Sequence, residues 1–234
     1  MKIFLFLPSL FLAGCRSAAP GYTPVPQANV PVVSTKVSSP EVLMPLDVGN
    51  QWSYALHTET TRVGEPIERE DTTIDFRVEK STGTQALLVL ENEGKVVERQ
   101  DWTVDARGIY QGSAGVNRVP YSPPQPLALL PLDAGRTFEW KGRGMLGNGE
   151  VAEGRASCTV RAAETVDTGR GPMSAIPVST RTTFAKGNCD NTSWYRPGIG
   201  LVRVRQTATD VKAGVQTVMI LTLNNYALKS QPTL

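Results

Sequence analysis

The sequence has few of the residues that most enzymes and metal proteins need. Its 234 residues include one histidine, His57, and three cysteines. A single histidine excludes most metal sites and the catalytic triads that depend on an imidazole base. No Gly-x-Ser-x-Gly elbow or phosphate loop occurs in the sequence. We therefore expect no catalytic residue, no metal and no cofactor.

The sequence also lacks a charge excess that would attract a polyanion. Lys and Arg number 24 against 22 Asp and Glu, and no basic stripe alternates with aromatic residues, so nucleic acid is not an expected partner. His57 follows Leu56 in a strand pattern and is expected to face outward. The acidic residues Glu68, Glu70 and Asp71 lack the ligand spacing of a calcium loop. We expect them to be solvent-exposed charges in a turn.

Long apolar runs are scarce, and the main one lies at the amino terminus. The run Ile3–Gly14 is too short to span a bilayer, which takes about 20 apolar residues. After Met1 and Lys2 it matches the charged and apolar regions of a signal peptide over residues 1–14. The run ends in a segment that resembles the lipobox of bacterial lipoproteins, Leu12-Ala13-Gly14-Cys15.

That resemblance implies cleavage before Cys15 and attachment of lipid to its thiol, which anchors the chain to a membrane. An ordinary secretory signal with a chance cysteine is the alternative. In enterobacterial sorting, aspartate after the cysteine retains the protein in the inner membrane, so Arg16 implies the periplasmic face of the outer membrane. In a one-membrane organism the protein would lie on the outer face of the cytoplasmic membrane.

Residues 15–42 are predicted to be a tether. They contain five prolines among Ser, Ala, Thr and Val, and no apolar period persists. A semi-extended segment of this kind reaches about 3 Å per residue, on the order of 70–80 Å in all. The spacer would let a folded domain turn freely above the lipid headgroups.

Two cysteines remain once Cys15 carries lipid. In an oxidising compartment Cys158 and Cys189 are expected to form a disulfide. Closing a loop of roughly 30 residues would contribute about 3–4 kcal/mol in the chain-entropy model. Two separate, buried free thiols are the alternative.

Residues 43–228 are predicted to form one all-β domain, followed by a tail at 229–234. Apolar residues alternate with polar ones at Ile74, Phe76 and Val78, and the segment 215–226 is apolar and β-branched enough for a closing strand. Short turn signals such as Arg196–Ile199 separate the strands, so successive strands should be antiparallel neighbours. We expect a meander of about ten strands forming a curved sheet or open barrel.

An internal similarity divides this domain into two similar halves, residues 43–110 and 129–205. Residues 44–54 and 130–140 share Pro-Leu-Asp-x-Gly and then an aromatic pair two residues apart. In each copy the next strand has its apolar residues at matching alternate positions. Each copy ends with a strand that contains a tryptophan, Trp102 or Trp194, followed by a Gly-Ile pair. Proline and glycine would shape the entry turn of each half. Chance similarity is the alternative.

Two segments of the domain resemble uncharacterised, β-rich envelope lipoproteins. These are Pro-Leu-x-x-Gly-x-x-Trp-x-Tyr at residues 45–54 and Trp-Tyr-x-x-Gly-x-Gly-Leu-Val at residues 194–202. The resemblance implies a large antiparallel sheet and brings no catalytic residue. Some relatives suggest a likeness to the concave half-barrels that carry lipoproteins through the periplasm, which is an analogy of fold.

Six aromatic residues are candidates to line a ligand cavity. Core filling is the commoner role of such side chains, whereas a cavity would suit a lipid or acyl chain. Three small residues at alternate positions share one face of a strand, namely Ala152, Gly154 and Ala156. They either leave space on that face or admit a bulky neighbour. The six aromatic residues are Trp52, Tyr54, Trp102, Phe138, Trp140 and Trp194.

Three functions follow, in order of preference. The first is a membrane-anchored, non-enzymatic envelope lipoprotein that binds an apolar ligand or an envelope protein. The second is a structural component that pairs with partners through β edges. The third is a hydrolase with an unusual site. Cys189 beside Asp190 could imitate a catalytic cysteine, but no usable histidine accompanies it.

Overall fold

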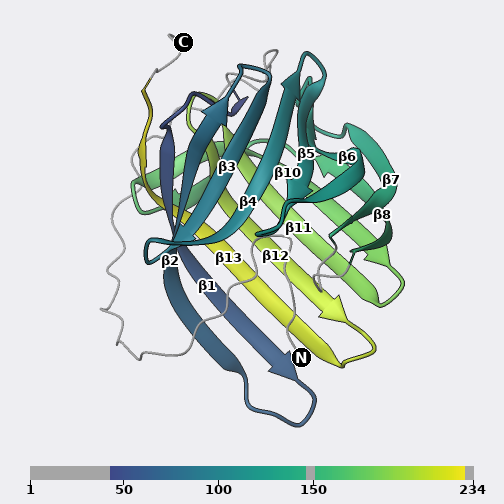
Figure 1. Cartoon of the computed structure of the whole chain (residues 1–234). Coiled ribbons are helices and arrows are strands. Elements are labelled where there is room, and N and C mark those ends of the chain that lie inside the picture. Colours follow the sequence, from purple (N-terminus) through teal and green to yellow (C-terminus); the bar gives the residue numbers. More distant parts are fainter. Residues whose placement is uncertain (1–42, 146–150, 230–234) are drawn as a thin grey trace.

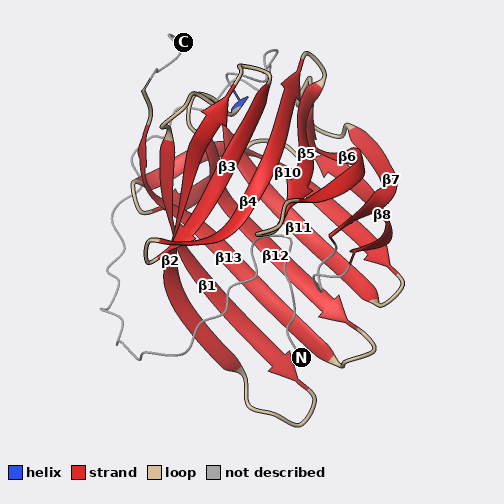
Figure 2. Cartoon of the chain, in the orientation of Figure 1, coloured by secondary structure: helices blue, strands red, loops and turns tan. Residues whose placement is uncertain are grey.

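The computed structural model describes residues 43–145 and 151–229, which form thirteen antiparallel strands (Figures 1 and 2). The predicted signal peptide, Cys15 and most of the tail lie outside the described residues, as does the tether. No helix within the described ranges is long and apolar enough to cross a membrane. The strands are β1 (Gln51–Arg62), β2 (Glu68–Ser81), β3 (Gln85–Asn92), β4 (Lys95–Asp105), β5 (Gly108–Ala114), β6 (Val119–Leu129), β7 (Thr137–Met145), β8 (Val151–Val160), β9 (Glu164–Thr168), β10 (Gly171–Phe184), β11 (Gly187–Arg196), β12 (Gly200–Asp210) and β13 (Val215–Ala227).

Twelve of these strands close into a barrel. Strands β1 to β8 pair in sequence order, β8 pairs with β10, and β10 to β13 lead back to β1. β9 is additional and pairs with the first part of β10. The predicted all-β antiparallel fold is confirmed, although the barrel is closed and has more strands than the ten expected.

The sequence pattern does not indicate strand β6. It contains Pro120, Pro123, Pro124 and Pro126, and proline removes a backbone donor from a ladder. β6 accordingly has two register shifts against β5, and Ser122 with Arg143 is its one ladder pair with β7. Prolines at this density indicate a loop in the sequence, and only the strands on both sides keep β6 extended.

The two Pro-Leu-Asp-x-Gly segments make the same turn. The Gly49 amide donates to the Val78 carbonyl at 2.9 Å, and the Gly135 amide donates to the Val160 carbonyl at 2.9 Å. The two glycines have φ of +88° and +89°, a left-handed conformation that glycine adopts without strain. Residue 51 then pairs with 77, and residue 137 with 159, so the strands after each turn start in the same register.

The strand order is compatible with two halves of six strands, with β1 to β6 followed by β7, β8 and β10 to β13. In this alignment β9 is an insertion in the second half. The twofold relation between residues 43–110 and 129–205 stays a prediction beyond the matched turns.

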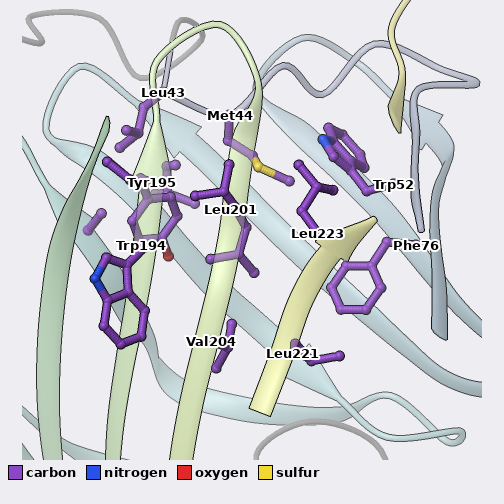
Figure 3. Packing of buried hydrophobic residues seen from close by; sticks show 14 of the residues in the cluster. Leu43, Met44, Trp52, Phe76, Trp194, Tyr195, Leu201, Val204, Leu221 and Leu223 are labelled. Carbon is purple, nitrogen blue, oxygen red and sulfur yellow. The ribbon is translucent and has the colours of Figure 1, made fainter. Parts of the chain in front are cut away.

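Inward-facing apolar side chains build the main core at one end of the barrel. Trp52, Tyr54, Phe76 and Leu88 are each 1% exposed or less. Figure 3 shows side chains from β1, β2, β11, β12 and β13 meeting around Leu201 and Leu223. Burial of this apolar surface is the main stabilising contribution to the fold.

The β9–β10 hairpin and the segment before β1 cover this end of the barrel. Val166 on β9 and Met173 on β10 belong to the core cluster, and the Gly169 amide in the hairpin loop donates to the Leu223 carbonyl at 2.7 Å. Leu43 and Met44 are fully buried there. The apolar end of the barrel is therefore covered by chain rather than open to solvent.

Candidate functional site

The interior of the barrel changes from apolar to polar along its strands. On β4, Val104 and Trp102 belong to the core, whereas Gln100 and Glu98, the next two inward positions, are polar and 2–3% exposed. Strands on both sides of the barrel bring further buried polar side chains to the same region. The buried polar residues here are Glu98, Gln100, Gln111, Gln125, Thr182, Ser193, Gln206 and Thr217.

A cavity of about 70 Å³ lies where the apolar and polar parts meet. One wall comes from β4, β5 and β6, and the facing wall comes from β10, β11 and β12. A cavity of this size accommodates several water molecules, since one needs about 10–15 Å³. The lining residues are Phe76, Gln100, Trp102, Gln111, Gln125, Pro126, Leu127, Thr180, Thr182, Cys189, Asn191, Ser193, Tyr195, Leu201, Val204 and Gln206.

Three amide atoms in this lining have no hydrogen-bond partner among the described residues. They are Gln125 Oε1, Asn191 Oδ1 and Gln206 Nε2. Gln125 is 4% exposed and Gln206 1%. Leaving a buried polar group unpaired costs about 1–3 kcal/mol, so native structures pair such groups with protein, water or ligand. The cavity is thus supplied with two unpaired acceptors and one unpaired donor.

A chain of hydrogen bonds connects the cavity to a buried carboxyl group. Trp102 Nε1 donates to Gln100 Oε1 at 2.8 Å, and Gln100 Nε2 donates to Glu98 Oε1 at 2.8 Å. Burial raises the pKa of Glu98 to about 7, while hydrogen bonds from Gln100 and the Gly115 backbone act in the opposite direction. Glu98 therefore changes its charge near neutral pH. It lies behind Gln100 and does not line the cavity.

Of the six predicted aromatic residues, Trp102 borders this cavity. Trp52 and Tyr54 are buried in the core, where Trp52 Nε1 donates to the Ile199 carbonyl at 2.6 Å and Tyr54 Oη to the Leu201 carbonyl at 2.8 Å. Trp194 also belongs to the core, and Phe138 packs against it partly buried. These aromatic residues mainly fill the core.

Trp140 lies apart from the main core, in a small cluster with Ala114, Tyr121 and Ala156. The Tyr121 and Trp140 rings meet edge to face, with centroids 6.1 Å apart. A Cβ at Gly142 would collide with the Trp140 ring, and one at Gly144 with the Tyr121 ring. The small residues noted in the sequence lie on β8 next to this pair, since Ala156 pairs with Trp140 in the ladder. They admit bulky neighbours rather than leave a free space.

The predicted disulfide between Cys158 and Cys189 is not formed, because both residues are free, buried thiols in the described structure. Cys158 on β8 pairs with Thr180, and Cys189 on β11 pairs with Thr182, so β10 runs between the two cysteines. Strands separated by one other strand lie about 9–10 Å apart, beyond the roughly 7 Å limit for a disulfide. Sequence separation carried no information about this intervening strand.

The single histidine lies on the outside of the barrel. His57 Nδ1 is 2.7 Å from Asp71 Oδ1, and Arg69 on β2 donates to Glu59 at 2.6 Å. The acidic group expected in a turn is instead part of β2, where Glu68, Glu70 and Asp71 pair across to β1. No group of three or more His, Cys, Asp or Glu able to hold a metal ion occurs within the described residues.

The polar interior was missed by the sequence reasoning, although a signal for part of it exists. Trp102 and Val104 show which alternate residues of β4 face inward. Continuing this alternation towards the start of the strand places Gln100 and Glu98 inside the barrel. The other polar residues of the interior had no such local signal. Gln125 lies on the proline-rich β6, and Asn191 with Gln206 lies in strands with several polar inward positions.

No family model matches the chain, and no curated protein matches it. Among solved structures the chain is similar to the hypothetical lipoprotein YmcC of Escherichia coli, with 10% identity over 74% of this chain and 88% of that chain and a TM-score of 0.37. It is also similar to a protein with a YmcC-like fold from Bacteroides fragilis (12% identity, 80% and 99% covered, TM-score 0.35). A DUF1329 family protein from Desulfovibrio piger aligns with 9% identity over 81% and 90% and a TM-score of 0.27. At these values the likeness identifies neither a family nor a function.

Proposed function

We propose that this protein is a lipid-anchored envelope lipoprotein that binds a small polar molecule inside its barrel and catalyses no reaction. The observation that carries the proposal is the cavity with three unpaired amide atoms, Gln125 Oε1, Asn191 Oδ1 and Gln206 Nε2. A ligand with matching donors and acceptors would satisfy all three. The enclosing barrel would exclude bulk water and strengthen each hydrogen bond.

This proposal replaces the apolar ligand expected from the sequence. The apolar end of the barrel holds packed core, whereas the cavity is lined by amides and hydroxyls together with aromatic and aliphatic side chains. An acyl chain in that space would leave the three amide atoms unpaired, at about 1–3 kcal/mol for each. A polar molecule is therefore the better match.

Two observations weigh against the other functions. Burial raises the pKa of the Cys189 thiol to about 12, with Asp190 adding to the rise, so the thiolate that a nucleophile needs is scarce at neutral pH. Barrel closure pairs both sides of most strands, which leaves little free edge for a structural partner. Binding inside the barrel needs neither a nucleophile nor an edge.

The anchor remains part of the proposal. Lipid on Cys15 would hold the barrel at a membrane, with the periplasmic face of the outer membrane favoured, and residues 15–42 would act as the tether. Two or three lipid chains give a lasting attachment. The test is Cys15→Ser, which should leave the protein uncleaved, or soluble after cleavage. Unchanged processing and membrane partitioning of the variant would contradict the anchor.

The binding proposal is tested by native mass spectrometry of the full-length protein, extracted in mild detergent from its own envelope. We expect a bound small molecule that disappears in Gln206→Leu. Gln216→Leu is the matched control, since Gln216 is exposed on the neighbouring strand β13, and it should retain the adduct. A wild-type protein that carries no adduct, or an adduct that both variants retain, would contradict binding in the cavity.

A further inference from the structure

The lining of the cavity also specifies the chemical class of its occupant. Resting on the binding function proposed above, we infer that the ligand is an uncharged, hydroxyl-rich molecule, of the kind represented by a neutral sugar or cyclic polyol. It presents at least two donors and one acceptor to the amides and turns an apolar side to the aromatic residues. Three features of the cavity lead to this class.

The first feature is the absence of charge from the lining. None of the sixteen described residues around the cavity is Lys, Arg, Asp or Glu, and Glu98 is separated from the cavity by Gln100. A charged ligand would lose its hydration without gaining a counterion, which costs far more than the burial of a neutral polar group. An uncharged ligand avoids that cost.

The second feature is the arrangement of the unpaired amide atoms. Asn191 on β11 and Gln206 on β12 are direct partners in the ladder, so an acceptor and a donor lie side by side on one wall. Gln125 on β6 supplies an acceptor from the facing wall. A hydroxyl group both donates and accepts. Neighbouring hydroxyls on one small molecule could therefore satisfy the pair on the first wall, and another hydroxyl the single acceptor opposite.

The third feature is the set of aromatic side chains beside these amides. Phe76, Trp102 and Tyr195 line the same cavity. The Trp102 indole is held in place by its hydrogen bond to Gln100 Oε1. Rigid rings contribute contact area at low entropic cost. They suit a ligand with a saturated C–H face, such as the ring of a sugar.

A matched set of three probes tests the class: glucose, glucosamine and glucuronate, which share a ring and are neutral, cationic and anionic at pH 7. Binding to the full-length protein in detergent is measured by saturation-transfer NMR and titration calorimetry. We expect saturable binding of glucose, at least tenfold weaker binding of both charged probes, and a loss of tenfold or more for glucose in Gln206→Leu and Gln125→Leu. Gln216→Leu should bind as the wild type does, and circular dichroism confirms that each variant is folded.

Charged probes that bind as tightly as glucose would overturn the inference, as would glucose binding that survives in both cavity variants. Failure of all three probes would also overturn it. In that case an adduct seen by native mass spectrometry would leave the binding function standing with a different ligand class. Without an adduct, the cavity would hold ordered water only, and both proposals would fail.

Discussion

The two ends of the barrel interior are built from the same strands but contain different side chains, apolar at one end and polar at the other. At the end covered by the β9–β10 hairpin, Trp52 and Leu88 lie in a continuous apolar core. Towards the other end, inward positions such as Gln111 and Gln206 are buried but polar. The contrast teaches that part of a closed sheet suffices for a stabilising core, while the remaining inward positions are available for a site.

The largest expected effect is in the apolar end. Trp52→Ala removes a large buried side chain and its hydrogen bond to the Ile199 carbonyl, and should lower the free energy of unfolding by about 3–5 kcal/mol. Urea unfolding followed by circular dichroism measures the change. A loss below about 1 kcal/mol would show that this end is not the main source of stability.

The next effect concerns the buried carboxyl group of the polar end. The pKa of Glu98 rises from 4.5, the ordinary value for a solvated glutamate, to about 7 in the fold, so the folded state holds the proton more tightly. This contribution to stability is complete below pH 4.5 and is lost as pH rises towards 7, up to about 3 kcal/mol. Glu98→Gln removes the dependence. Relative to this variant, the wild type should lose stability between pH 5 and pH 8 in urea titrations, and parallel pH profiles would contradict the assignment.

A smaller effect is expected where small residues accommodate the Tyr121–Trp140 pair. Gly144→Ala places a Cβ against the Tyr121 ring and should cost about 1–3 kcal/mol of stability by overpacking. The cost should shrink when Tyr121→Leu is introduced as well, in a double-mutant cycle. Gly112→Ala is the control, since the nearest atom to its Cβ would be the Asp101 carbonyl at 3.4 Å. Equal losses at the two glycines would mean that the ring contact is not the cause.

The smallest expected effect on stability is at the polar end, and it tests the difference between the two ends most directly. Gln206→Leu replaces a buried amide whose Nε2 is unpaired with an apolar group of similar size. It should change the free energy of unfolding of the ligand-free protein by no more than about 1 kcal/mol, or raise it. Thermal and urea unfolding, compared with Gln216→Leu, measure the change. A loss of several kcal/mol would show that Gln206 is a structural residue rather than part of a binding site.

Much of the local structure could be predicted from the sequence. The alternation at Ile74, Phe76 and Val78 placed β2 with its correct inward face, and the turn at Arg196–Ile199 was located between two strands. The matched Pro-Leu-Asp-x-Gly segments make equal turns, because proline and glycine restrict the backbone locally. The signal for β6 was lost because its prolines favour a loop wherever neighbouring strands do not hold the chain.

Little of the candidate site could be predicted, because its members come from strands far apart in the sequence. Trp102 was among the expected lining residues, while Gln125, Asn191 and Gln206 were not. Their importance depends on facing each other across a closed barrel and on having no partner there. Neither property leaves a trace in the residues beside them.

The sequence by itself determined the all-β class, the inward face of its clearest strands and the two entry turns, since these depend on side-chain alternation and on the backbone preferences of single residues. It also carries the lipobox resemblance at Cys15, on which the proposed anchor depends. Closure of the barrel was decided only by the tertiary structure. So were the separation of Cys158 from Cys189 by β10 and the meeting of amides in the cavity. These follow from strand register and ring closure, which place residues by their position across the sheet rather than along the chain.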